Sequence, residues 1–455
     1  MPDDQHDVPQ PPGTVPASTA AGAAGSRLDR YVDHYAARTA TMTASEIRAL
    51  FAVASRPEVV SLAGGMPYLS ALPLDAVAGT LDRLVLERGT TALQYGSGQG
   101  DEVLREQTTE VMRLVGIEGH PDDVVVTTGS QQALDLVTRI FVDPGDVVLA
   151  EAPSYVGALQ TFRSYQADVV HVAMDDKGLD PVALEEALVR LRTQGRKVAF
   201  LYTIPSYHNP AGLSQPEHRR EEVLAVAQRH GLLILEDDPY GLLGFDGAPL
   251  RALRADDAEG VIYLGSFSKT FAPGFRVGWA LAPHGVREKL VLASEATQLC
   301  PSAFSQLAVS GYLASQDWKG QIATFRDLYR ERRDAMLDAL GSAMPAGTTW
   351  TVPSGGFYVW LTLPEGFDAR AMLPRAVTAR VAYVPGPAFY ADGDGARSMR
   401  LSYCFPDPDR IREGVRRLAG VIEEEIELRD TFGPLPGAAA PRPLRDGDGP
   451  GPDLA

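Results

Sequence analysis

The strongest constraint on the fold is an alternation of short apolar runs with helical patterns through the middle of the chain. Strand-like runs stand at 124–128, 147–150, 198–203, 232–236 and 261–265. Helical patterns, such as 131–141 and 216–230, lie between most of them. This alternation is typical of an α/β layer with a mostly parallel sheet. A further run at 279–282 follows the fifth too closely for a helical crossover, so we expect it to be antiparallel.

The end of the chain has a different pattern. A long helix is expected at 318–343, followed by strand-like runs at 357–363, 381–385 and 399–404 and a last helix that ends near residue 428. This order predicts a smaller α+β domain. Two helices near the front, at 26–39 and 44–54, are expected to pack with it.

The two ends of the chain are rich in Pro, Ala and Gly and show no apolar period, so both are predicted to be disordered. The predicted organisation is a tail at 1–26, N-terminal helices at 27–70, a large domain at 71–315, a small domain at 316–432 and a tail at 433–455.

Composition excludes several classes of protein. The chain has 455 residues, with 42 Lys and Arg against 59 Asp and Glu, so its net charge of −17 disfavours a nucleic-acid partner. It has no apolar run of about 18 residues, so no membrane span is expected. Cys300 and Cys404 are the only cysteines and the N-terminus does not resemble a signal peptide, which together predict a cytoplasmic protein.

The sharpest chemical signal is Ser266-Phe267-Ser268-Lys269, which follows the run at 261–265. Ser266, Ser268 and Arg276 together suit an anion next to the Lys269 amine. An amine beside a phosphate-binding group suits a Schiff base to a phosphorylated aldehyde. A surface loop with incidental serines is the alternative.

A second signal is the acidic run Glu236-Asp237-Asp238, which ends the run at 232–236. Ligands of α/β proteins bind at the carboxyl ends of strands. A carboxylate opposite a ring nitrogen would keep that nitrogen protonated, and at close contact such a pair is worth about 4 kcal/mol at an effective dielectric constant near 20. No His lies in the acidic run, so no metal site is predicted.

Two turns complete the candidate site. Ser130 opens a helix after the run at 124–128, where free N–H groups suit a phosphate, although a simple helix cap is the alternative. Asn209 lies in a turn-rich segment and could donate to a phenolic oxygen, although Asn-Pro is also an ordinary turn. The glycines of 96–100 lack the third glycine of a nicotinamide motif, because Asp101 stands there.

A phosphate turn, Asn209, Asp237 and Lys269 occur in this order, and with them the chain resembles the fold-type I, pyridoxal-phosphate-dependent aminotransferases of class I/II. It is most similar to their α-aminoadipate/kynurenine aminotransferase branch, over about residues 40–425. The segments that carry the resemblance are LAGGMP (62–67), LQYGSGQG (93–100), TTGSQQALDL (127–136), EAPSYVGAL (151–159), HNPAG (208–212), EDDPYG (236–241), GSFSKTFAPGFRVGW (265–279) and MRLSYCF (399–405). The resemblance implies an α/β fold in which a mostly parallel seven-stranded sheet lies between helices, with a smaller α+β domain.

The resemblance also implies the cofactor, pyridoxal 5′-phosphate, and a role for each motif residue. Lys269 holds the cofactor as an internal aldimine and then moves the Cα proton of the substrate. Asp237 pairs with the ring nitrogen, Tyr155 stacks on the ring, and Asn209 and Tyr240 bind the phenolic oxygen. The implied phosphate ligands are Ser130, Gln131, Ser266, Ser268 and Arg276.

Substrate and partner residues are implied in the same way. Arg400 grips the α-carboxylate bidentately, aided by Asn209 and the backbone of Gly64-Gly65. Tyr95 reaches the phosphate of the neighbouring subunit, so the active unit is a homodimer. Arg48 could read a distal carboxylate, with a solvated helix face as the alternative.

The predicted function is the transfer of an amino group between an α-amino acid and a 2-oxo acid. Four positions, Asp101, His208, Ala211 and Gly244, depart from the family pattern, which often has an aromatic residue, Gln, Thr and Arg there. These departures leave open β- or γ-elimination, replacement or annulation chemistry with the same cofactor. A non-catalytic, aminotransferase-like sensor is a third hypothesis, disfavoured because the residues before the match lack basic helices.

Overall fold

The computed structural model of the chain describes residues 29, 31–42 and 56–432. The predicted tails and the predicted helix at 44–54 lie outside these residues. Within the described part of 26–39, the chain forms two short 3-10 helices, η2 (Val32–His34) and η3 (Ala37–Thr41), instead of the expected α-helix. No residue of η2 is buried, and a helix this short is marginal without a packed face.

The large sheet has the strand order β2-β9-β8-β7-β6-β3-β4-β5. Its strands are β2 (Val124–Thr127), β3 (Val147–Ala152), β4 (Asp168–Asp175), β5 (Gly178–Leu179), β6 (Val198–Thr203), β7 (Ile234–Asp237), β8 (Val261–Ser266) and β9 (Gly278–Leu281). The pairs from β8 through β4 are parallel. β9 is antiparallel to both of its neighbours, as expected from its short connection. Seven strands form the expected sheet, and the two-residue β5 extends its edge.

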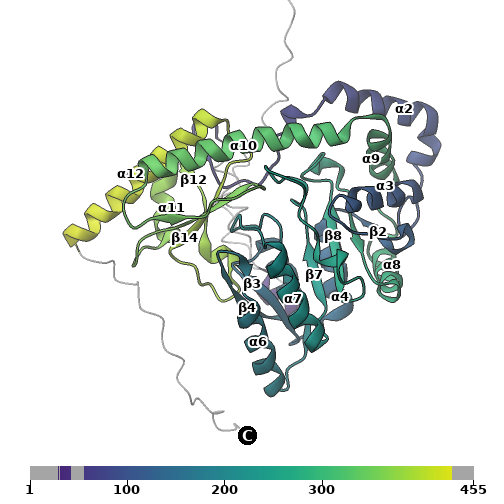
Figure 1. Cartoon of the computed structure of the whole chain (residues 1–455), viewed down its shortest axis with the longest axis horizontal. Helices are drawn as coiled ribbons and strands as arrows, with labels where there is room; N and C mark the ends of the chain where they lie inside the picture. Colours follow the sequence, from purple (N-terminus) through teal and green to yellow (C-terminus); the bar gives the residue numbers. More distant parts are fainter. Residues whose placement is uncertain (1–28, 30, 43–55, 433–455) are drawn as a thin grey trace, which may run out of the picture.

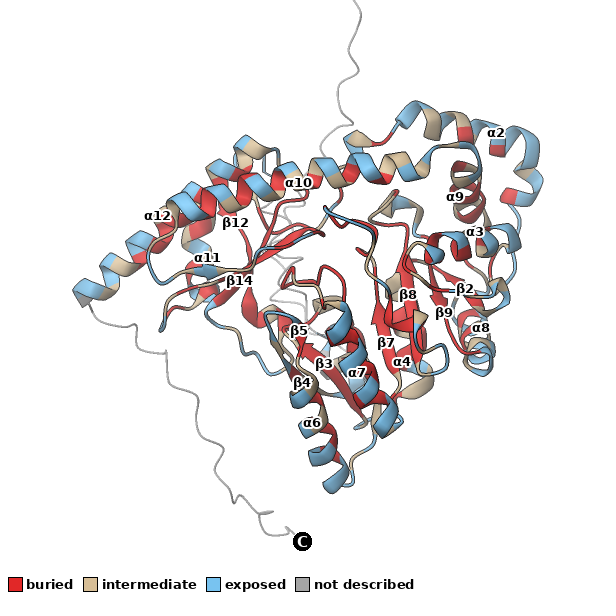
Figure 2. Ribbon diagram, in the orientation of Figure 1, coloured by how far each residue is buried: buried red, intermediate tan, exposed pale blue. Residues whose placement is uncertain are grey.

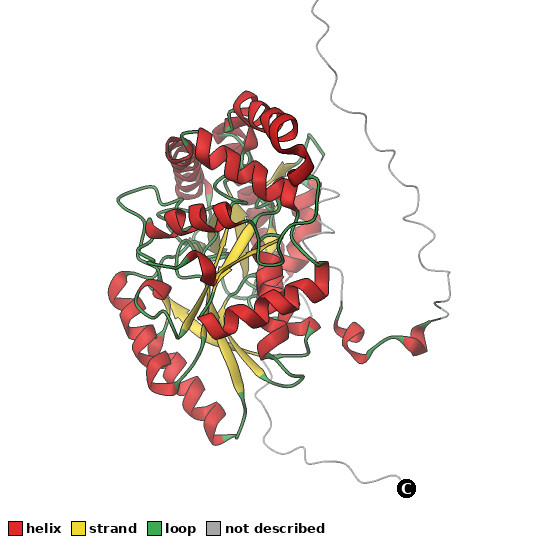
Figure 3. Ribbon diagram, turned by 90° about the vertical axis from the view of Figure 1, so that its right-hand side faces the viewer, coloured by secondary structure: helices red, strands yellow, loops and turns green. Residues whose placement is uncertain are grey.

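Helices cover both faces of this sheet (Figure 3). On one face α4 (Ser130–Phe141), α5 (Val156–Ser164) and α8 (His284–Gln298) pack on inward side chains such as Val125, Phe200 and Ile262. On the other face α6 (Pro181–Thr193) and α7 (Glu217–His230) pack on the alternate side chains, among them Leu201 and Val261. The strands β2, β7, β8 and β9 are thus buried along their whole length (Figure 2), which explains their continuous apolar runs. β4, nearer the edge of the sheet, is mostly half-buried or exposed.

Three more helices lie beyond β2: α2 (Leu74–Ala92), α3 (Glu102–Arg113) and α9 (Ala303–Ser315), of which α2 and α3 both contact α9. Asp101, which interrupts the glycine motif, is the N-cap of α3 and accepts a hydrogen bond from the Leu104 N–H at 2.9 Å. Asp101 therefore has a structural role at the start of α3.

A smaller sheet lies beside the large one (Figure 1). Its antiparallel strands are β10 (Thr349–Trp350), β11 (Tyr358–Thr362), β14 (Ser398–Ser402) and β13 (Val384–Pro385), and β1 (Val60–Ser61) pairs in parallel with β12 (Val381–Ala382). The helices α10 (Trp318–Ala343), α11 (Ala369–Thr378) and α12 (Pro408–Phe432) complete this part. The domain boundaries near residues 71 and 316 stay predictions. Within the described residues, no helix is both long and apolar enough to cross a membrane.

Five strands of the large sheet lead directly into predicted site residues. β2 is followed by Ser130 and β3 by Tyr155, β6 leads to the turn with Asn209, and β7 and β8 end at Asp237 and Ser266. Because these strands run in one direction, their carboxyl ends meet at one edge of the sheet. The small sheet faces this edge and adds Arg400 from β14.

Candidate active site

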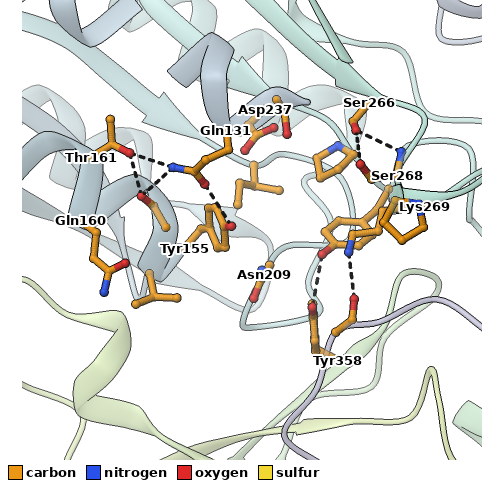
Figure 4. Close-up of a pocket in the computed structure, with 18 of the residues that line it drawn as sticks. Gln131, Tyr155, Gln160, Thr161, Asn209, Asp237, Ser266, Ser268, Lys269 and Tyr358 are labelled. Carbon is orange, nitrogen blue, oxygen red and sulfur yellow. Dashed lines mark hydrogen bonds between the residues drawn. The ribbon is translucent and has the colours of Figure 1, made fainter. Parts of the chain in front are cut away.

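A cavity of about 670 Å³ lies where the two sheets meet (Figure 4). Twelve predicted site residues line it: Gly65, Ser130, Gln131, Tyr155, Asn209, Asp237, Tyr240, Ser266, Ser268, Lys269, Arg276 and Arg400. Tyr95 is not among the lining residues and is 77% exposed. Arg48 lies outside the described residues.

Lys269 provides the only amine among the described residues of the cavity wall. Its Nζ donates a hydrogen bond to the Gly65 carbonyl oxygen at 2.8 Å. The pKa of Lys269 is lowered to about 8, mainly by burial; Cys404 opposes this shift, and the nearby charges of Arg400 and Arg276 add to it. A lowered pKa makes a neutral, nucleophilic amine accessible near neutral pH.

Hydroxyl groups and a guanidinium group meet at one end of the cavity. Ser266 Oγ donates to Ser268 Oγ at 2.8 Å, and Arg276 Nη1 lies 3.5 Å from the same Ser268 oxygen. Ser130 begins α4 beside them, where the first helical N–H groups are free. The turn needs glycine at Gly129, because its φ is 76° and a Cβ there would overlap the Arg276 side chain. Such a cradle suits a phosphate.

The acidic run at the end of β7 presents one carboxylate to the cavity. Asp237 Oδ2 accepts a hydrogen bond from Tyr202 Oη at 2.8 Å, whereas the buried Oδ1 has no partner. Burial raises the pKa of Asp237 to about 7, although the Tyr202 hydroxyl opposes this shift. A cationic group opposite Oδ1 would favour the carboxylate and supply the missing partner.

Tyr155 is held by the side chain of Gln131. Tyr155 Oη donates to Gln131 Oε1 at 3.3 Å, and Gln131 Nε2 donates to the Gly157 carbonyl and to Thr161 Oγ1 at 3.2 and 2.8 Å. The Gln131 side chain is therefore occupied with the tyrosine, which leaves its backbone N–H, at the start of α4, for a phosphate. With its hydroxyl engaged, the Tyr155 ring is fixed as a flat wall of the cavity (Figure 4).

Asn209 and Arg400 form the wall of the cavity on the side of the small sheet. Arg400 Nη1 donates to Asn209 Oδ1 at 2.9 Å and Nη2 donates to the Ala63 carbonyl at 2.8 Å. This bond orients the Asn209 amide, so that its NH₂ group remains available as a donor. The Arg400 guanidinium also lies over the Tyr358 ring, 4.2 Å from its centroid.

The departure at His208 has a structural explanation. His208 Nε2 lies 3.0 Å from Glu151 Oε2, and both side chains are fully buried. Glu151 also accepts hydrogen bonds from Thr203 Oγ1 and the Ile204 N–H, each at 2.8 Å. His208 thus lies against the end of β3, and its Nδ1 accepts a hydrogen bond from the Ala211 N–H at 3.2 Å within the turn that contains Asn209.

The sequence did not identify ten of the residues that line the cavity, among them two groups with polar side chains. Thr161 and Gln160 come from the second turn of α5, and Tyr358 comes from the start of β11. The one available signal was the segment Gly355-Gly356-Phe357-Tyr358, which combines turn glycines with aromatic residues before a strand. That signal does not indicate which side chain faces the large sheet.

Together these walls fit pyridoxal phosphate. The cradle around Arg276 matches a phosphate, the unpartnered Asp237 Oδ1 matches a protonated ring nitrogen, and the Tyr155 ring matches a planar heterocycle. Lys269 supplies the amine that an aldehyde requires.

Comparisons with known proteins identify the family of the chain. The family model described as aminotransferase class I and II matches residues 57–418. The chain is 44% identical to aromatic-amino-acid aminotransferase 1 of Thermococcus litoralis over 87% of this chain and 96% of that protein. It is 41% identical to the kynurenine aminotransferase of Pyrococcus horikoshii, solved in complex with PMP, with a TM-score of 0.83 over 87% of this chain and 98% of that one.

A third relative is the alpha-aminoadipate aminotransferase of Thermus thermophilus, solved with N-(5′-phosphopyridoxyl)-L-leucine. It is 38% identical, with a TM-score of 0.81 over 88% of this chain and 99% of that one. These relatives do not favour the hypotheses of elimination, replacement or annulation chemistry or of a non-catalytic sensor. The chain therefore belongs to the class I and II aminotransferases of fold type I, and it is an enzyme that transfers amino groups with pyridoxal phosphate as its cofactor.

Proposed function

We propose that this cavity transfers an amino group between an α-amino acid and a 2-oxo acid, with Lys269 as the residue that binds the cofactor covalently and moves the proton. The observation that carries the proposal is the convergence of Lys269, Asp237 and Arg400 on one cavity. In this arrangement the amine can bind the cofactor aldehyde and the carboxylate can pair with the ring nitrogen of the cofactor. The guanidinium can bind the substrate carboxylate.

Arg400 binds the α-carboxylate and so orients the substrate Cα. Its Nη1 is fixed by Asn209 and its Nη2 by the Ala63 carbonyl, while the Tyr358 ring supports its face. A preorganised guanidinium loses little freedom when it binds a carboxylate bidentately.

Bound pyridoxal phosphate supplies the electron sink for the pair of electrons left at Cα. Asp237 Oδ1 keeps the ring nitrogen protonated, which strengthens that sink. With the cofactor bound, Lys269 Nζ would take the proton from Cα and return it to the carbon of the cofactor aldehyde. A pKa of about 8 suits this exchange, because the amine must both accept and release the proton.

The remaining residues position the cofactor. Ser130, Gln131, Ser266, Ser268 and Arg276 hold the phosphate, with Gln131 acting through its backbone N–H. Tyr155 stacks on the ring in a positioning role, because its hydroxyl is engaged by Gln131. Asn209 and Tyr240 bind the ring oxygen.

For the substrate side chain we propose a large group. Among the described residues, the cavity wall has no charged side chain besides Asp237, Lys269, Arg276 and Arg400. The wall toward α5, with Val156, Gln160 and Ser164, is neutral. The relatives above are named for aromatic amino acids, kynurenine and alpha-aminoadipate. A distal carboxylate would require a further cation, which is the role predicted for Arg48.

The proposed active unit is a homodimer in a reducing, cytoplasmic setting. Large apolar side chains of α2 and the following loop are exposed, among them Leu86, Leu93 and Tyr95 at 84%, 74% and 77%. Exposed apolar clusters mark interaction surfaces. Arg276 is also exposed in the single chain, so the phosphate end of the cavity is open to Tyr95 of the partner subunit. Both cysteines are free thiols.

The visible spectrum of the purified holoenzyme tests the reaction. Amino acids with aromatic, acidic, basic and sulfur-containing side chains are added one at a time. The proposal expects the absorption band to bleach with a large donor and to return when a 2-oxo acid is added, whereas Lys269→Ala gives no multiple turnover. A persistent long-wavelength band, with a product that keeps its nitrogen but loses a side-chain group, would contradict it.

A further inference from the structure

The hydroxyl of Tyr358 is a polar group of the cavity to which the proposed reaction assigns no task. Tyr358 lines the cavity and is 3% exposed. Its ring has a clear contact, since the Arg400 guanidinium lies 4.2 Å from the ring centroid. A phenylalanine would offer the same ring, so the hydroxyl needs a separate explanation.

The Tyr358 hydroxyl is held between the Tyr240 hydroxyl and Gly65. Tyr240 Oη donates to Tyr358 Oη at 3.4 Å (Figure 4). On its other side the hydroxyl takes the space beside Gly65, where a Cβ would overlap it. The two rings meet edge to face, with centroids 6.0 Å apart and planes at 86°, so the two hydroxyls approach each other at the cavity wall.

Both hydroxyls remain donors at ordinary pH. Burial raises the pKa of Tyr358 and raises that of Tyr240 well above its usual value. The other titratable or charged groups that act on the pair are Arg400, Tyr155 and Cys404. A hydroxyl hydrogen can rotate about its C–O bond, so either phenol can donate to the other.

We propose that Tyr358 is a positioning residue for the ring oxygen of the bound cofactor: its hydroxyl donates to Tyr240 Oη, and the hydrogen of Tyr240 then points at that oxygen. A negatively charged oxygen draws the Tyr240 hydrogen, because hydrogen bonds to charged acceptors are about twice as strong as neutral ones. The hydrogen bond between the two phenols then runs in the opposite direction. Tyr240 donates to the ring oxygen and no longer to Tyr358, and Tyr358 becomes the donor to Tyr240 Oη. No proton is transferred between the two phenols, because both O–H groups only rotate about their C–O bonds.

The consequence is measurable in the cofactor spectrum. In the bound cofactor the ring oxygen would lie next to the nitrogen that joins Lys269 to the cofactor, and the two atoms would share a titrating proton. A donor on the oxygen competes with that proton and lowers its pKa, so removal of the donor raises it. Loss of one charge-assisted bond corresponds to about one to two pKa units. Tyr358 acts only by polarising the Tyr240 hydroxyl, so loss of the Tyr358 hydroxyl corresponds to a smaller rise of about 0.2 to 0.5 pKa unit.

The test is a pH titration of the visible absorption band in the holoenzymes of Tyr358→Phe, Tyr240→Phe and the double variant. We expect a small rise of the spectral pKa for Tyr358→Phe, a larger rise for Tyr240→Phe, and no further rise in the double variant. The matched control is Tyr383→Phe, which removes a buried hydroxyl that donates to the Ala369 carbonyl outside the cavity wall; its spectral pKa should stay at the wild-type value.

A second comparison separates the hydroxyl from the ring. Tyr358→Phe keeps the ring under Arg400, so the KM for the amino acid should not change, whereas Tyr358→Leu removes the ring and should raise that KM. The inference rests on the proposed orientation of the cofactor, with Tyr240 at the ring oxygen. If Tyr240→Phe shifts the spectrum and Tyr358→Phe does not, the inference alone is wrong. If Tyr240→Phe also leaves the spectrum unchanged, the proposed orientation is wrong as well.

Discussion

At the residue scale, burial acts on the two central groups of the site with the same result. It lowers the pKa of Lys269 from 10.5 to about 8 and raises that of Asp237 from 3.8 to about 7. In each case the neutral form becomes more accessible, because a low-dielectric cavity penalises charge. The neutral amine can react with an aldehyde, and a protonated ring nitrogen would return Asp237 to its carboxylate form. Cofactor binding and the charge of the site are therefore coupled.

The lowered pKa of Lys269 predicts how cofactor capture depends on pH. Below pH 8 the amine is mostly protonated and unreactive, so the rate of capture should rise up to about pH 8 and then level off. The measurement is the growth of the visible band after pyridoxal phosphate is added to enzyme freed of cofactor. The control is a simple alkyl amine in the same buffers, whose rate should keep rising toward pH 10. An enzyme rate that also rises to pH 10 would contradict a lowered pKa.

The bond between Gln131 and Tyr155 predicts a coupled pair. Gln131→Leu removes the acceptor of the Tyr155 hydroxyl but keeps the backbone N–H at the start of α4. We expect the Kd for the cofactor to rise about fivefold, which corresponds to one neutral hydrogen bond of about 1 kcal/mol. Equilibrium binding to the cofactor-free enzyme measures it.

Two comparisons check that pair. In a Tyr155→Phe background the same Gln131→Leu change should cost much less, because the hydroxyl it serves is gone. Gln160→Leu, at the exposed mouth of the cavity, is the matched control and should leave the cofactor Kd as it is. Equal costs of Gln131→Leu in both backgrounds would show that Gln131 acts independently of Tyr155.

At the scale of elements, the site depends on how the end of β3 is tied to the loop after β6. Glu151, at the end of β3, accepts from Thr203 Oγ1 and the Ile204 N–H and lies 3.0 Å from His208 Nε2. One buried carboxylate therefore orders the segment that delivers Asn209. The parallel pairing of β3 with β6 brings these groups together.

Glu151→Ala should be strongly destabilising. It would leave the buried donors Thr203 Oγ1, the Ile204 N–H and Gln215 Nε2 without this acceptor, and each unsatisfied buried donor costs about 1–3 kcal/mol. The midpoint of urea unfolding, measured without cofactor, should fall accordingly. Thr203→Val, which removes one donor to Glu151 and one acceptor of Gln215 Nε2, is the graded control and should cost less, because Gln215 Nε2 keeps Glu151 Oε1 as an acceptor. A Glu151→Ala midpoint at or above that of Thr203→Val would contradict the assigned role.

The same elements show what the sequence could predict. Continuous apolar runs such as 198–203 identified the strands because burial on both faces leaves a local pattern, and the residues at their carboxyl ends followed. The partners of those residues came from distant segments and left no local pattern. His208 appeared as a departure that weakened the functional reading, and only the pairing of β3 with β6 explains it. Tyr358 reaches the cavity from the small sheet, and no local sequence pattern predicts that its side chain faces the large sheet.

At the scale of the whole molecule, the proposed homodimer concerns one end of the cavity, which is open to solvent in the single chain. Arg276, at the phosphate end, is exposed, and so are the aromatic and aliphatic side chains of the loop after α2. Tyr95 and Leu93 bury little surface within their own chain, and in the proposed twofold homodimer the partner subunit would cover them. In a twofold dimer, Tyr95 of one subunit would lie near the active site that contains Lys269 of the other subunit.

This arrangement predicts the behaviour of hybrid dimers. Tyr95→Phe dimers should bind the cofactor about tenfold more weakly, as expected for one lost bond to a charged phosphate, and Lys269→Ala dimers should show no turnover. A hybrid with one variant in each chain would contain one site with both native residues. Co-expression of differently tagged chains allows these hybrids to be isolated. They should have half of the wild-type activity and the wild-type cofactor affinity.

The decisive control carries the same two substitutions in one chain, paired with a wild-type chain. Its remaining Lys269 would receive Phe from the double variant, so this hybrid should bind the cofactor as weakly as the Tyr95→Phe dimer. Because both hybrids contain one copy of each substitution, only their arrangement differs between the two measurements. If Tyr95 served its own chain, the order would reverse: the chain with both substitutions would leave an intact neighbour, and the hybrid with one substitution per chain would be the weak binder.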